Sequence, residues 1–369
     1  MRILLTGAQG VVGSEVAERL AAEAAGRTGP DIVRTARRPV AAGTTGTTDN
    51  NGTTGTTGTT DNNGPAPVLW NIGAEPAPDP LTGRPWDVIV HTAASTRWTM
   101  SRQEATDANI RTLRAVLALA GPDTHVVHVS TAYVGGVRAP EDLRGAEFEG
   151  YRNGYEWSKS VCEEIVATDH RGPATIVRPP LVLGRREDGR IGRFSGPYSL
   201  FPALVSGLAA VVVGDPDGYA EISPVDEVAE VIAGAALGAP PASPLTEVIA
   251  AGQDSMRLSD LVRITCDTLN AFRAEHGVDP IAQPPTVSTD SWNRFFLPLA
   301  AQWLSPVQQE AVKLLAMFQS YTSMGEPFEP TRKVADPGGV MAASVLHWAR
   351  SKPRQALGRT VPWTLIDAA

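Results

Sequence analysis

RILLTGAQGVVGSEVAERLAAEAAG, residues 2–26, is the most informative stretch of this 369-residue chain. An apolar strand at residues 3–6 leads through closely spaced glycines into an alanine-rich helix that is predicted to begin near Val11. Gly7 permits a tight turn, Gly10 lets the backbone approach a pyrophosphate, and Gly13 lets the helix pack closely on the strand. Because this GxxGxxG turn follows the first strand and opens a helix, it predicts a dinucleotide-binding domain.

Apolar runs of strand length continue through the first half of the chain. They are DIVRTARRP (31–39), PVLWNI (67–72), WDVIVHTAAS (86–95), HVVHVSTAYV (125–134) and ATIVRPPLVLG (174–184). Predicted helices at residues 103–120 and 155–168 lie between them, and strands that alternate with helices form a parallel sheet covered on both faces. We therefore predict an α/β fold: a Rossmann-like, doubly wound parallel sheet with a smaller, mostly helical C-terminal substrate lobe.

The end of the second predicted strand carries arginines where an acidic residue would hold the ribose of NAD. These are Arg34, Arg37 and Arg38. Two guanidinium groups beside the adenosine ribose would suit a 2′-phosphate, so the sequence predicts NADPH (NADP) rather than NADH as the cofactor. A solvated basic loop remains the alternative reading of these residues.

The predicted domain boundaries follow from these patterns. We predict an NADP-binding Rossmann domain at residues 1–180, completed by residues 222–253, which include one more strand at 245–252. Residues 181–221 and 254–369 would form the substrate-binding lobe, with an apolar helix at 306–321. Residues 42–64 contain GTTGTTDNNG twice and carry no large apolar side chain, so we expect a mobile surface loop there.

Composition excludes several classes of protein. The formal charge of -8, with no run of lysine and arginine longer than a pair, argues against a nucleic-acid surface and favours small molecules or proteins as partners. The two cysteines, Cys162 and Cys266, provide neither a disulfide framework nor a metal cluster. Met1 opens directly into a strand, and no apolar run reaches the ~20 residues of a membrane span, so a cytoplasmic protein without a membrane span is expected. The sequence does not indicate an oligomeric state.

Tyr155 and Lys159 lie four positions apart on a predicted helix, in NGYEWSKSVCEE, residues 153–164. Four residues are close to one helical turn, so the phenol and the ammonium share a face, where the positive charge can change the acidity of the phenol. The pattern also recurs by chance, as an aromatic ring half-buried under a solvated lysine stem.

Taken in order, TGAQGVVG, HTAAS, VSTAYV, YEWSK and VRPPLVLG resemble the extended short-chain dehydrogenase/reductases over about the first 185 residues, apart from the threonine-rich insert. Within that superfamily, VSTAYV, NGYEWSKSVCEE, GRIGRFSGPYSLF and GYAEISPVDEVAEVI resemble the thioester-reductase and fatty-acyl-CoA-reductase branch, called the male-sterility type. This closer resemblance extends to about Gly234 and is faint past Leu258.

The resemblance implies roles for individual residues. The catalytic set would be Thr131, Tyr155 and Lys159, supported by Asn109: the lysine binds the nicotinamide ribose and lowers the pKa of the phenol, and the threonine orients the substrate carbonyl. On residue type alone, Asn109 could equally be a capping or surface asparagine. The implied cofactor-binding residues are Gly7, Gln9, Gly10, Val11, Val12, Gly13, Arg37, Arg38, Asn71, Ile72, Ala93, Ala94, Ser95, Tyr155, Lys159 and Pro179. Most relatives have aspartate and leucine where this chain has Asn71 and Ile72, which puts that adenine contact in doubt.

The implied substrate is an acyl thioester, carried by CoA or by a carrier protein and reduced to an aldehyde or onward to an alcohol. Substrate contacts are expected from Ser95, Trp98 and Tyr133, with Arg97 and residues 192–201 near the mouth of the pocket. Two alternatives remain: a ketone or alcohol dehydrogenase or sugar-nucleotide epimerase or dehydratase of the same superfamily, and a non-catalytic NADP-binding partner protein. The arginines disfavour an epimerase that keeps NAD, and the presence of both Tyr155 and Lys159 disfavours the non-catalytic reading.

Overall fold

The computed structural model describes residues 1–24, 29–39, 47–48, 54–55, 65–135, 147–296, 298, 304–305, 308–309 and 320–360. The chain forms two compact units. Unit 1 consists of Met1–Pro180 and Val225–Ile249, and unit 2 consists of Leu181–Pro224 and Ala250–Ala369.

Seven parallel strands of unit 1 form its sheet, in the order β13-β8-β7-β6-β1-β2-β5. They are β1 (Arg2–Thr6), β2 (Asp31–Ala36), β5 (Val68–Leu69), β6 (Val88–His91), β7 (His125–Val129), β8 (Ala174–Arg178) and β13 (Leu245–Ala250). Leu4 of β1 pairs with Val33 on one side and with Ile89 on the other. The strand order therefore reverses at β1, with β2 and β5 added on one side and β6, β7 and β8 on the other. The carboxyl ends of β1 and β6 form the crevice in which such sheets bind ligands.

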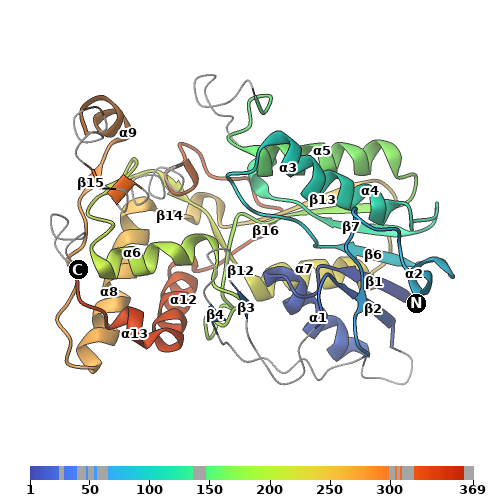
Figure 1. The fold of residues 1–369 in the computed structure, drawn as a ribbon, viewed down its shortest axis with the longest axis horizontal. Helices are drawn as coiled ribbons and strands as arrows, with labels where there is room; N and C mark the ends of the chain where they lie inside the picture. Colours follow the sequence, from blue (N-terminus) through green and yellow to red (C-terminus); the bar gives the residue numbers. More distant parts are fainter. Residues whose placement is uncertain are drawn as a thin grey trace. The chain divides into compact units, whose positions relative to one another are not determined.

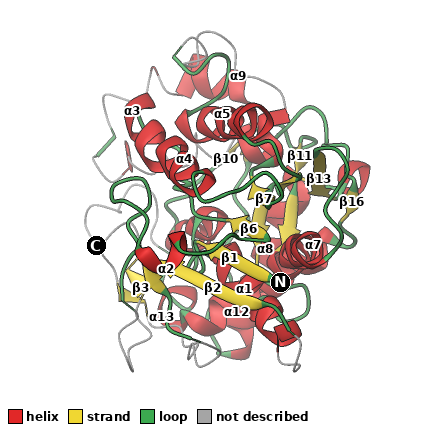
Figure 2. Ribbon diagram, turned by 90° about the vertical axis from the view of Figure 1, so that its right-hand side faces the viewer, coloured by secondary structure: helices red, strands yellow, loops and turns green. Residues whose placement is uncertain are grey.

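Helices cover both faces of this sheet (Figure 1). On one face α1 (Val11–Ala24) packs against α7 (Val225–Leu237). The other face carries α3 (Arg102–Ala105), the π-helical turn η1 (Thr106–Ile110), α4 (Arg111–Leu117) and α5 (Gly154–Asp169). Figure 2 shows the strands between these two layers. Leu4 and Ile89 are fully buried, as expected for strands that pack on both faces. The predicted doubly wound parallel sheet is confirmed.

Four shorter elements of unit 1 lie in the segments between its longer strands and helices. They are β3 (Thr47–Thr48), β4 (Thr54–Gly55), α2 (Asp79–Thr82) and the 3-10 turn η2 (Ala132–Gly135). β3 and β4 pair in antiparallel fashion and belong to the threonine-rich insert. The rest of the insert lies outside the described residues, so the expectation of a mobile loop stays a prediction.

Unit 2 is built mainly from helices. They are η4 (Gly196–Ser199), α6 (Leu200–Ser206), η5 (Gly252–Asp254), α8 (Leu258–Glu275), α9 (Thr289–Ser291), η6 (Trp292–Phe296), α12 (Pro337–Ser351) and α13 (Pro353–Ala356). Short strand pairs join β9 (Leu181–Leu183) to β12 (Ile222–Pro224), β10 (Val212–Val213) to β15 (Thr286–Val287) and β11 (Tyr219–Ala220) to β14 (Met256–Arg257), and β16 (Arg332–Lys333) follows later in the chain. The helix predicted at 306–321 lies mostly outside the described residues.

α8 and α12 form the centre of unit 2, where they pack against each other. The Phe201 ring of α6 meets the Trp348 ring of α12 edge to face, with centroids 5.5 Å apart. Such pairs add stability beyond the apolar area they bury.

No helix in the described part of the chain is both long and apolar enough to cross a membrane. Within the same residues, no group of histidine, cysteine, aspartate and glutamate side chains could hold a metal ion. Cys162 and Cys266 are free thiols, and both are buried.

Candidate active site

The glycine turn between β1 and α1 has no room for side chains at its two ends. Gly7 has a φ of +74°, and a Cβ there would lie 2.6 Å from the backbone nitrogen of Ala93. A Cβ on Gly13 would lie 2.1 Å from the carbonyl oxygen of Gly7. The Thr92 hydroxyl comes within 2.6 Å of both positions and donates a hydrogen bond of 2.7 Å to the Thr6 carbonyl. Glycine is therefore required at both ends, since any side chain would separate α1 from β1 and β6.

The middle of the turn is open and suits an anion. A Cβ on Gly10 would approach only the Gly7 carbonyl oxygen, at 3.2 Å. The first backbone N–H groups of α1, at Val11 and Val12, have no acceptor within the helix, and they form the positive end of its dipole. Open space at Gly10 beside these donors fits the pyrophosphate of a dinucleotide.

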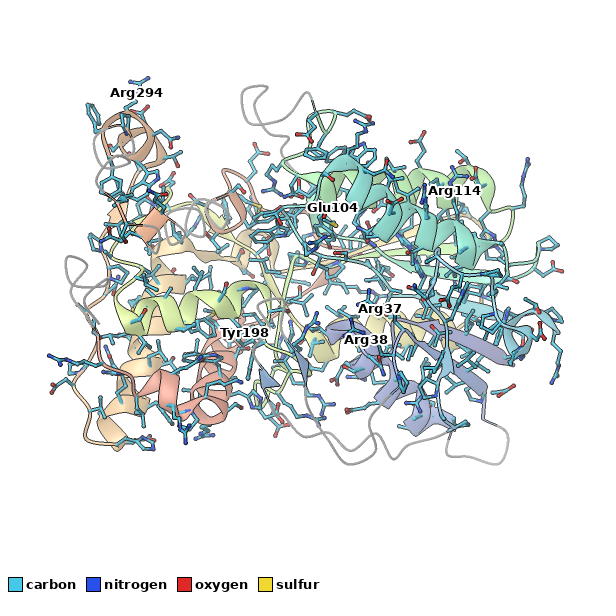
Figure 3. All side chains as sticks on the ribbon, viewed as in Figure 1. Arg37, Arg38, Glu104, Arg114, Tyr198 and Arg294 are labelled. Atoms are coloured by element: carbon cyan, nitrogen blue, oxygen red, sulfur yellow. The ribbon has the colours of Figure 1, made fainter. Side chains whose placement is uncertain are left out.

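Arg37 and Arg38 follow β2 directly, and both side chains are exposed (Figure 3). The side-chain amide of Gln9, in the glycine turn, lies 3.5 Å from the Arg38 carbonyl oxygen. Arg34 differs, because its guanidinium donates to the Pro65 carbonyl at 2.9 Å. Of the three arginines noted in the sequence, Arg37 and Arg38 are thus the pair available at this strand end.

Asn71 and Ile72 lie in the loop that follows β5. The Asn71 carbonyl accepts hydrogen bonds of 3.1 Å from the backbone of Ala74 and of Glu75, and its side chain is exposed. The Ile72 carbonyl accepts a bond of 3.4 Å from the Thr112 hydroxyl of α4. These bonds hold the loop through its main chain, and the proposed adenine contact of the two side chains stays a prediction.

Tyr155 stands in the first turn of α5. The helix begins after Asn153, whose side chain caps it by accepting a bond of 3.1 Å from the Glu156 N–H. A hydrogen bond joins the Tyr155 phenol to the Thr131 hydroxyl, and that hydroxyl also donates to the Pro179 carbonyl at 3.3 Å. The structure thus brings together the predicted tyrosine and threonine, and it places Pro179 behind them through its backbone.

The acidity of Tyr155 differs from what the resemblance implies. Burial raises its pKa to about 12, against a lowering effect of the Thr131 hydrogen bond and a further raising effect of the Glu156 carboxylate. The resemblance implied a lowered pKa caused by Lys159. In this structure the cost of burying a phenolate outweighs the lowering effect of the Thr131 hydrogen bond, so the phenol keeps its proton at neutral pH.

Lys159 lies one turn after Tyr155 and is 3% exposed. Its ammonium donates a hydrogen bond of 2.5 Å to the Val129 carbonyl at the end of β7. Burial lowers its pKa, while Cys162 and Glu163 raise it. The lysine is therefore anchored on the sheet, one helical turn after Tyr155.

Two buried histidines lie near Lys159 on neighbouring strands. His91 of β6 pairs with His128 of β7, and their rings stack with centroids 5.4 Å apart. Burial lowers the pKa of His91 to about 3, with a further lowering by Lys159. Its Nδ1 lies 2.8 Å from the Thr6 hydroxyl. Both imidazoles are neutral at pH 7, as expected of buried histidines that pack within the sheet.

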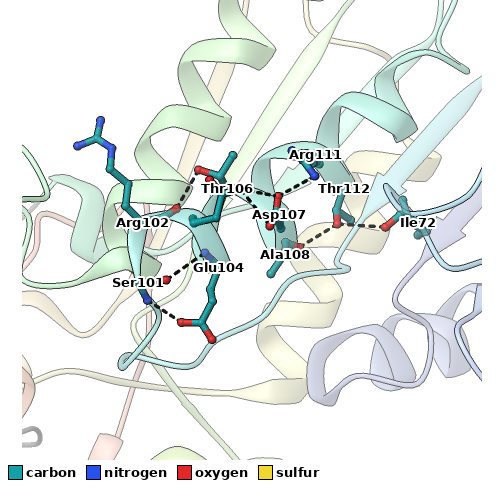
Figure 4. A network of polar contacts seen from close by, with 10 residues as sticks. Ile72, Ser101, Arg102, Glu104, Thr106, Asp107, Ala108, Arg111 and Thr112 are labelled. Atoms are coloured by element: carbon teal, nitrogen blue, oxygen red, sulfur yellow. Dashed lines mark hydrogen bonds and ion pairs between the residues drawn. The ribbon is translucent and has the colours of Figure 1, made fainter.

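Asn109 lies in η1, which interrupts the single helix predicted at 103–120. Figure 4 shows this segment: the Ser101–Glu104 capping box precedes it, and the Thr112 hydroxyl behind it donates to the Ala108 carbonyl at 2.8 Å. A π-turn accommodates one more residue than an α-turn, and such turns are frequent at functional sites. The Asn109 amide is buried and hydrogen-bonded to Ser95 and Ser158. It is neither a capping nor a surface asparagine.

Part of the chain is similar in sequence to known proteins. Residues 83–232 match a family described as male sterility protein. A fatty acyl-CoA reductase of Drosophila melanogaster, wat, is 26% identical over 174 residues, which are 38% of this chain and 34% of that protein. The chain thus aligns with about a third of the length of this curated relative.

Solved structures share the fold. The terminal R domain of the myxalamid PKS-NRPS pathway is similar with a TM-score of 0.65 and 20% identity, over 97% of this chain and 92% of that one. The Bordetella bronchiseptica enzyme WbmH, in complex with NAD+, is similar with a TM-score of 0.58 and 16% identity, over 95% and 98%. The chain shares its fold with these solved structures, and residues 83–232 match the male-sterility family. The predicted resemblance to the male-sterility branch is confirmed, and the family comprises NAD(P)-dependent oxidoreductases.

The predicted substrate residues have different surroundings. Tyr133 of η2 is buried, and the Arg152 guanidinium lies 4.9 Å from its ring centroid. Trp98 is half-buried in the loop after β6, in which Ala94 is exposed. Ser95 is held by its main chain through Asn109. Their contact with a substrate remains a prediction.

The sequence pattern did not indicate two residues that support the candidate site. Thr92 fills the space between Gly7 and Gly13. Ser158, inside YEWSK, connects Asn109 to the Tyr155 turn. The HTAAS and YEWSK stretches contain both residues, but a hydroxyl in a sequence does not reveal its partner.

Unit 2 contains an apolar cavity of about 40 Å³. Its lining includes Pro197, Leu200 and Phe201 from the segment predicted near the pocket mouth, together with Leu261 and Val262 of α8. Tyr198 of that segment is buried, and its hydroxyl accepts a bond of 2.9 Å from the Gly184 N–H. The segment therefore contributes to the interior of unit 2.

Proposed function

We propose that this protein is an NADPH-dependent reductase that converts an acyl thioester into an aldehyde or an alcohol. The observation that carries the proposal is the hydrogen-bonded pair of Tyr155 and Thr131, with Lys159 one helical turn away. These three groups meet beside the carboxyl end of β7 and in the same unit as the glycine turn.

The side chains can divide the work of carbonyl reduction. A bound nicotinamide cofactor would supply the hydride to the carbonyl carbon. Tyr155, whose pKa is about 12, holds its proton at neutral pH and can donate it to the oxygen on which negative charge develops. Thr131 orients that oxygen through its hydroxyl. With a thioester, hydride and proton addition give a hemithioacetal. Its C–S bond then breaks while the hydroxyl proton passes to sulfur, which leaves an aldehyde and a free thiol.

The residues at the end of β2 support NADPH as the cofactor of this reaction. Arg37 and Arg38 are exposed at the end of β2, where the adenosine ribose of such domains lies. Neither of these two positions carries an aspartate or glutamate, whose carboxylate would bind a free 2′-hydroxyl. Guanidinium groups bind phosphate oxygens in bidentate fashion, so the pair suits a 2′-phosphate.

The relatives support a thioester substrate. One is named a fatty acyl-CoA reductase, and one is the terminal R domain of a PKS-NRPS pathway. The apolar cavity in unit 2 is in keeping with a substrate that carries an aliphatic part. We extend the proposal to delivery on CoA or on a carrier protein.

The test mixes purified protein with NADPH and a panel of acyl-CoA and acyl-pantetheine thioesters, and follows cofactor absorbance and free thiol together. Loss of NADPH matched by release of thiol, and absent in Tyr155→Phe, is the expected result. If NADPH binds but no thioester is consumed, the thioester proposal is wrong. The same assay with ketones, alcohols and sugar nucleotides would then distinguish a dehydrogenase from an epimerase or dehydratase.

A further inference from the structure

A buried acid, Glu156, directly follows Tyr155 in the first turn of α5. Its side chain is 1% exposed. Its carboxylate accepts a hydrogen bond of 3.1 Å from the Nε of Arg152 and lies 2.7 Å from the Nη2 of the same guanidinium. The backbone N–H of Arg152 also donates to it, at 3.3 Å. A carboxylate is costly to bury unless it is paired and hydrogen-bonded, and the forked guanidinium of Arg152 provides both.

A helix cap explains part of this arrangement. The Asn153 side chain accepts the Glu156 N–H, while the Glu156 side chain reaches back to the N–H of Arg152, which resembles a capping box. Glu104 closes the corresponding cap of α3 with Ser101 (Figure 4), yet its side chain is 50% exposed. Water can stabilise the exposed carboxylate of Glu104, whereas the buried carboxylate of Glu156 depends on a counter-ion.

The Arg152 guanidinium also contacts the turn that carries Thr131. It lies 4.9 Å from the centroid of the Tyr133 ring, within the range of a cation–π attraction. Tyr133 follows Thr131 by two residues, and Glu156 follows Tyr155 by one. Arg152 therefore contacts a near neighbour of each member of the hydrogen-bonded pair of Tyr155 and Thr131.

We propose that Arg152 is a positioning residue, which keeps the Glu156 carboxylate in its buried place and thereby holds Tyr155 against Thr131. The proposal rests on the proposed function, since Tyr155 is taken there as the proton donor. Without the guanidinium, Glu156 would be an uncompensated buried charge. The carboxylate would turn toward water and shift the first turn of α5, and small displacements of a proton donor reduce the rate strongly.

The test is a double-mutant cycle of Arg152 and Glu156. Arg152→Met removes the charge but keeps the length of the side chain, and kcat should fall at least about tenfold while KM and the dissociation constant for NADPH stay within about twofold. Glu156→Gln keeps a hydrogen-bonding oxygen without the charge. In that background, Arg152→Met should lower kcat less than about twofold, because a neutral amide needs no counter-ion.

Amide hydrogen exchange at position 156 gives a second measurement, which follows the turn directly. This N–H donates to the Asn153 side chain at 3.1 Å. Its exchange should accelerate at least about tenfold in Arg152→Met. The double variant should exchange within about twofold of Glu156→Gln, because the neutral side chain stays in its place.

Arg102→Met is the matched control. Arg102 of α3 binds the Glu149 carboxylate and donates to the Glu147 carbonyl at 2.8 Å, in the loop that precedes α5. Its guanidinium also lies over an aromatic ring of α5, 4.2 Å from the centroid of Trp157. The control loosens the same loop but leaves Glu156 paired, so kcat and exchange at position 156 should stay within about twofold of wild type.

Two results would overturn the proposal. One is an equal loss of kcat in Arg102→Met and Arg152→Met, and the other is an equal effect of Arg152→Met with Glu156 and with Gln at that position. If Arg152→Met does not fold, Arg152→Lys takes its place, since lysine keeps the charge but cannot bind both oxygens as a fork. A loss of kcat that is at least about threefold larger with Glu156 than with Gln then supports the proposal, and equal losses contradict it.

The failures of the two proposals are distinguishable. If the wild-type protein reduces no thioester, the proposed function fails. Amide exchange at position 156 and NADPH binding do not need turnover, so they still test the role of Arg152.

Discussion

The two ends of the predicted cofactor site in unit 1 are built in opposite ways. At the tyrosine end, Thr131, Asn109 and Lys159 are buried, and each is hydrogen-bonded to the backbone of another segment. At the other end, Arg37 and Arg38 are exposed on a strand terminus. Proton transfer requires fixed distances, whereas recognition of a phosphate by charge tolerates mobile side chains. We therefore expect substitutions at the buried end to alter rate and those at the exposed end to alter cofactor choice.

The largest effect is expected at the buried end. Thr131→Val keeps the shape of the side chain but removes the hydroxyl beside Tyr155, so kcat/KM should fall about 100-fold or more because carbonyl orientation and oxyanion stabilisation are lost. Steady-state kinetics with NADPH and the active substrate measure this loss. Thr168→Val is the control, since that hydroxyl bonds the Glu164 carbonyl on an exposed part of α5. Equal activity of the two variants would contradict the role of Thr131.

Between the two ends, the glycine turn should affect cofactor binding itself. In Gly13→Ala the added Cβ would lie 2.1 Å from the Gly7 carbonyl, so α1 must shift and NADPH should bind at least about tenfold more weakly. Fluorescence titration and thermal unfolding measure the two consequences. Gly234→Ala in α7 is the control, because no atom lies within 4 Å of its added Cβ and alanine favours a helix. Unchanged NADPH affinity in Gly13→Ala would show that the turn does not hold the cofactor.

A smaller effect is expected at the exposed end. In the double variant Arg37→Ala/Arg38→Ala, affinity for NADPH should fall about 10- to 100-fold, or about 1.4–2.8 kcal/mol in total, because the exposed guanidinium groups no longer bind the 2′-phosphate. Affinity for NADH should not change. The dissociation constants for NADPH and NADH, measured for each variant, give the preference between the two cofactors. Arg34→Ala serves as the control, because the Arg34 guanidinium bonds the Pro65 carbonyl and is not expected to bind the 2′-phosphate. If both cofactors weaken equally, the pair does not recognise a 2′-phosphate.

The smallest effect concerns how the free energy of unfolding depends on pH, through the buried His91 near Lys159. The pKa of His91 is lowered to about 3, so between pH 6.5 and pH 3 the unfolded chain binds a proton that the folded protein does not. The contribution of His91 to the free energy of unfolding is complete above pH 6.5 and decreases as the pH drops, by about 2 kcal/mol at pH 5. Urea unfolding at pH 7 and pH 5 measures it. His91→Asn, which keeps a partner for Thr6, should lose less stability between these pH values than wild type, and an equal loss would contradict the assignment.

The sequence predicted those features that depend on local pattern. The strand, glycine turn and helix of residues 2–26 follow from apolar periodicity and from the steric freedom of glycine. The spacing of Tyr155 and Lys159 placed both on one helix, which the structure confirms. The parallel sheet followed from strands that alternate with helices.

Other features depend on distant partners and could not be read from local pattern. The segment around Asn109 has the composition of an ordinary helix, and its π-turn reflects bonds to the Ser95 loop and to α5. The acidity of Tyr155 depends on burial, which a helical spacing does not report. Ser158 was unremarkable until its partner was known.

The chain order of unit 1 has a consequence for how this protein folds. α1 packs against α7, and an ion pair of 3.3 Å between Arg19 and Glu230 joins the two helices. β13 completes the sheet of unit 1 beside β8. During synthesis, α1 therefore emerges about 200 residues before the helix that covers it, and an apolar face stays exposed for that time. A fragment that ends at Pro180 contains every proposed catalytic residue but lacks α7 and β13. We expect such a fragment to aggregate, because catalysis and foldability belong to different lengths of the same chain.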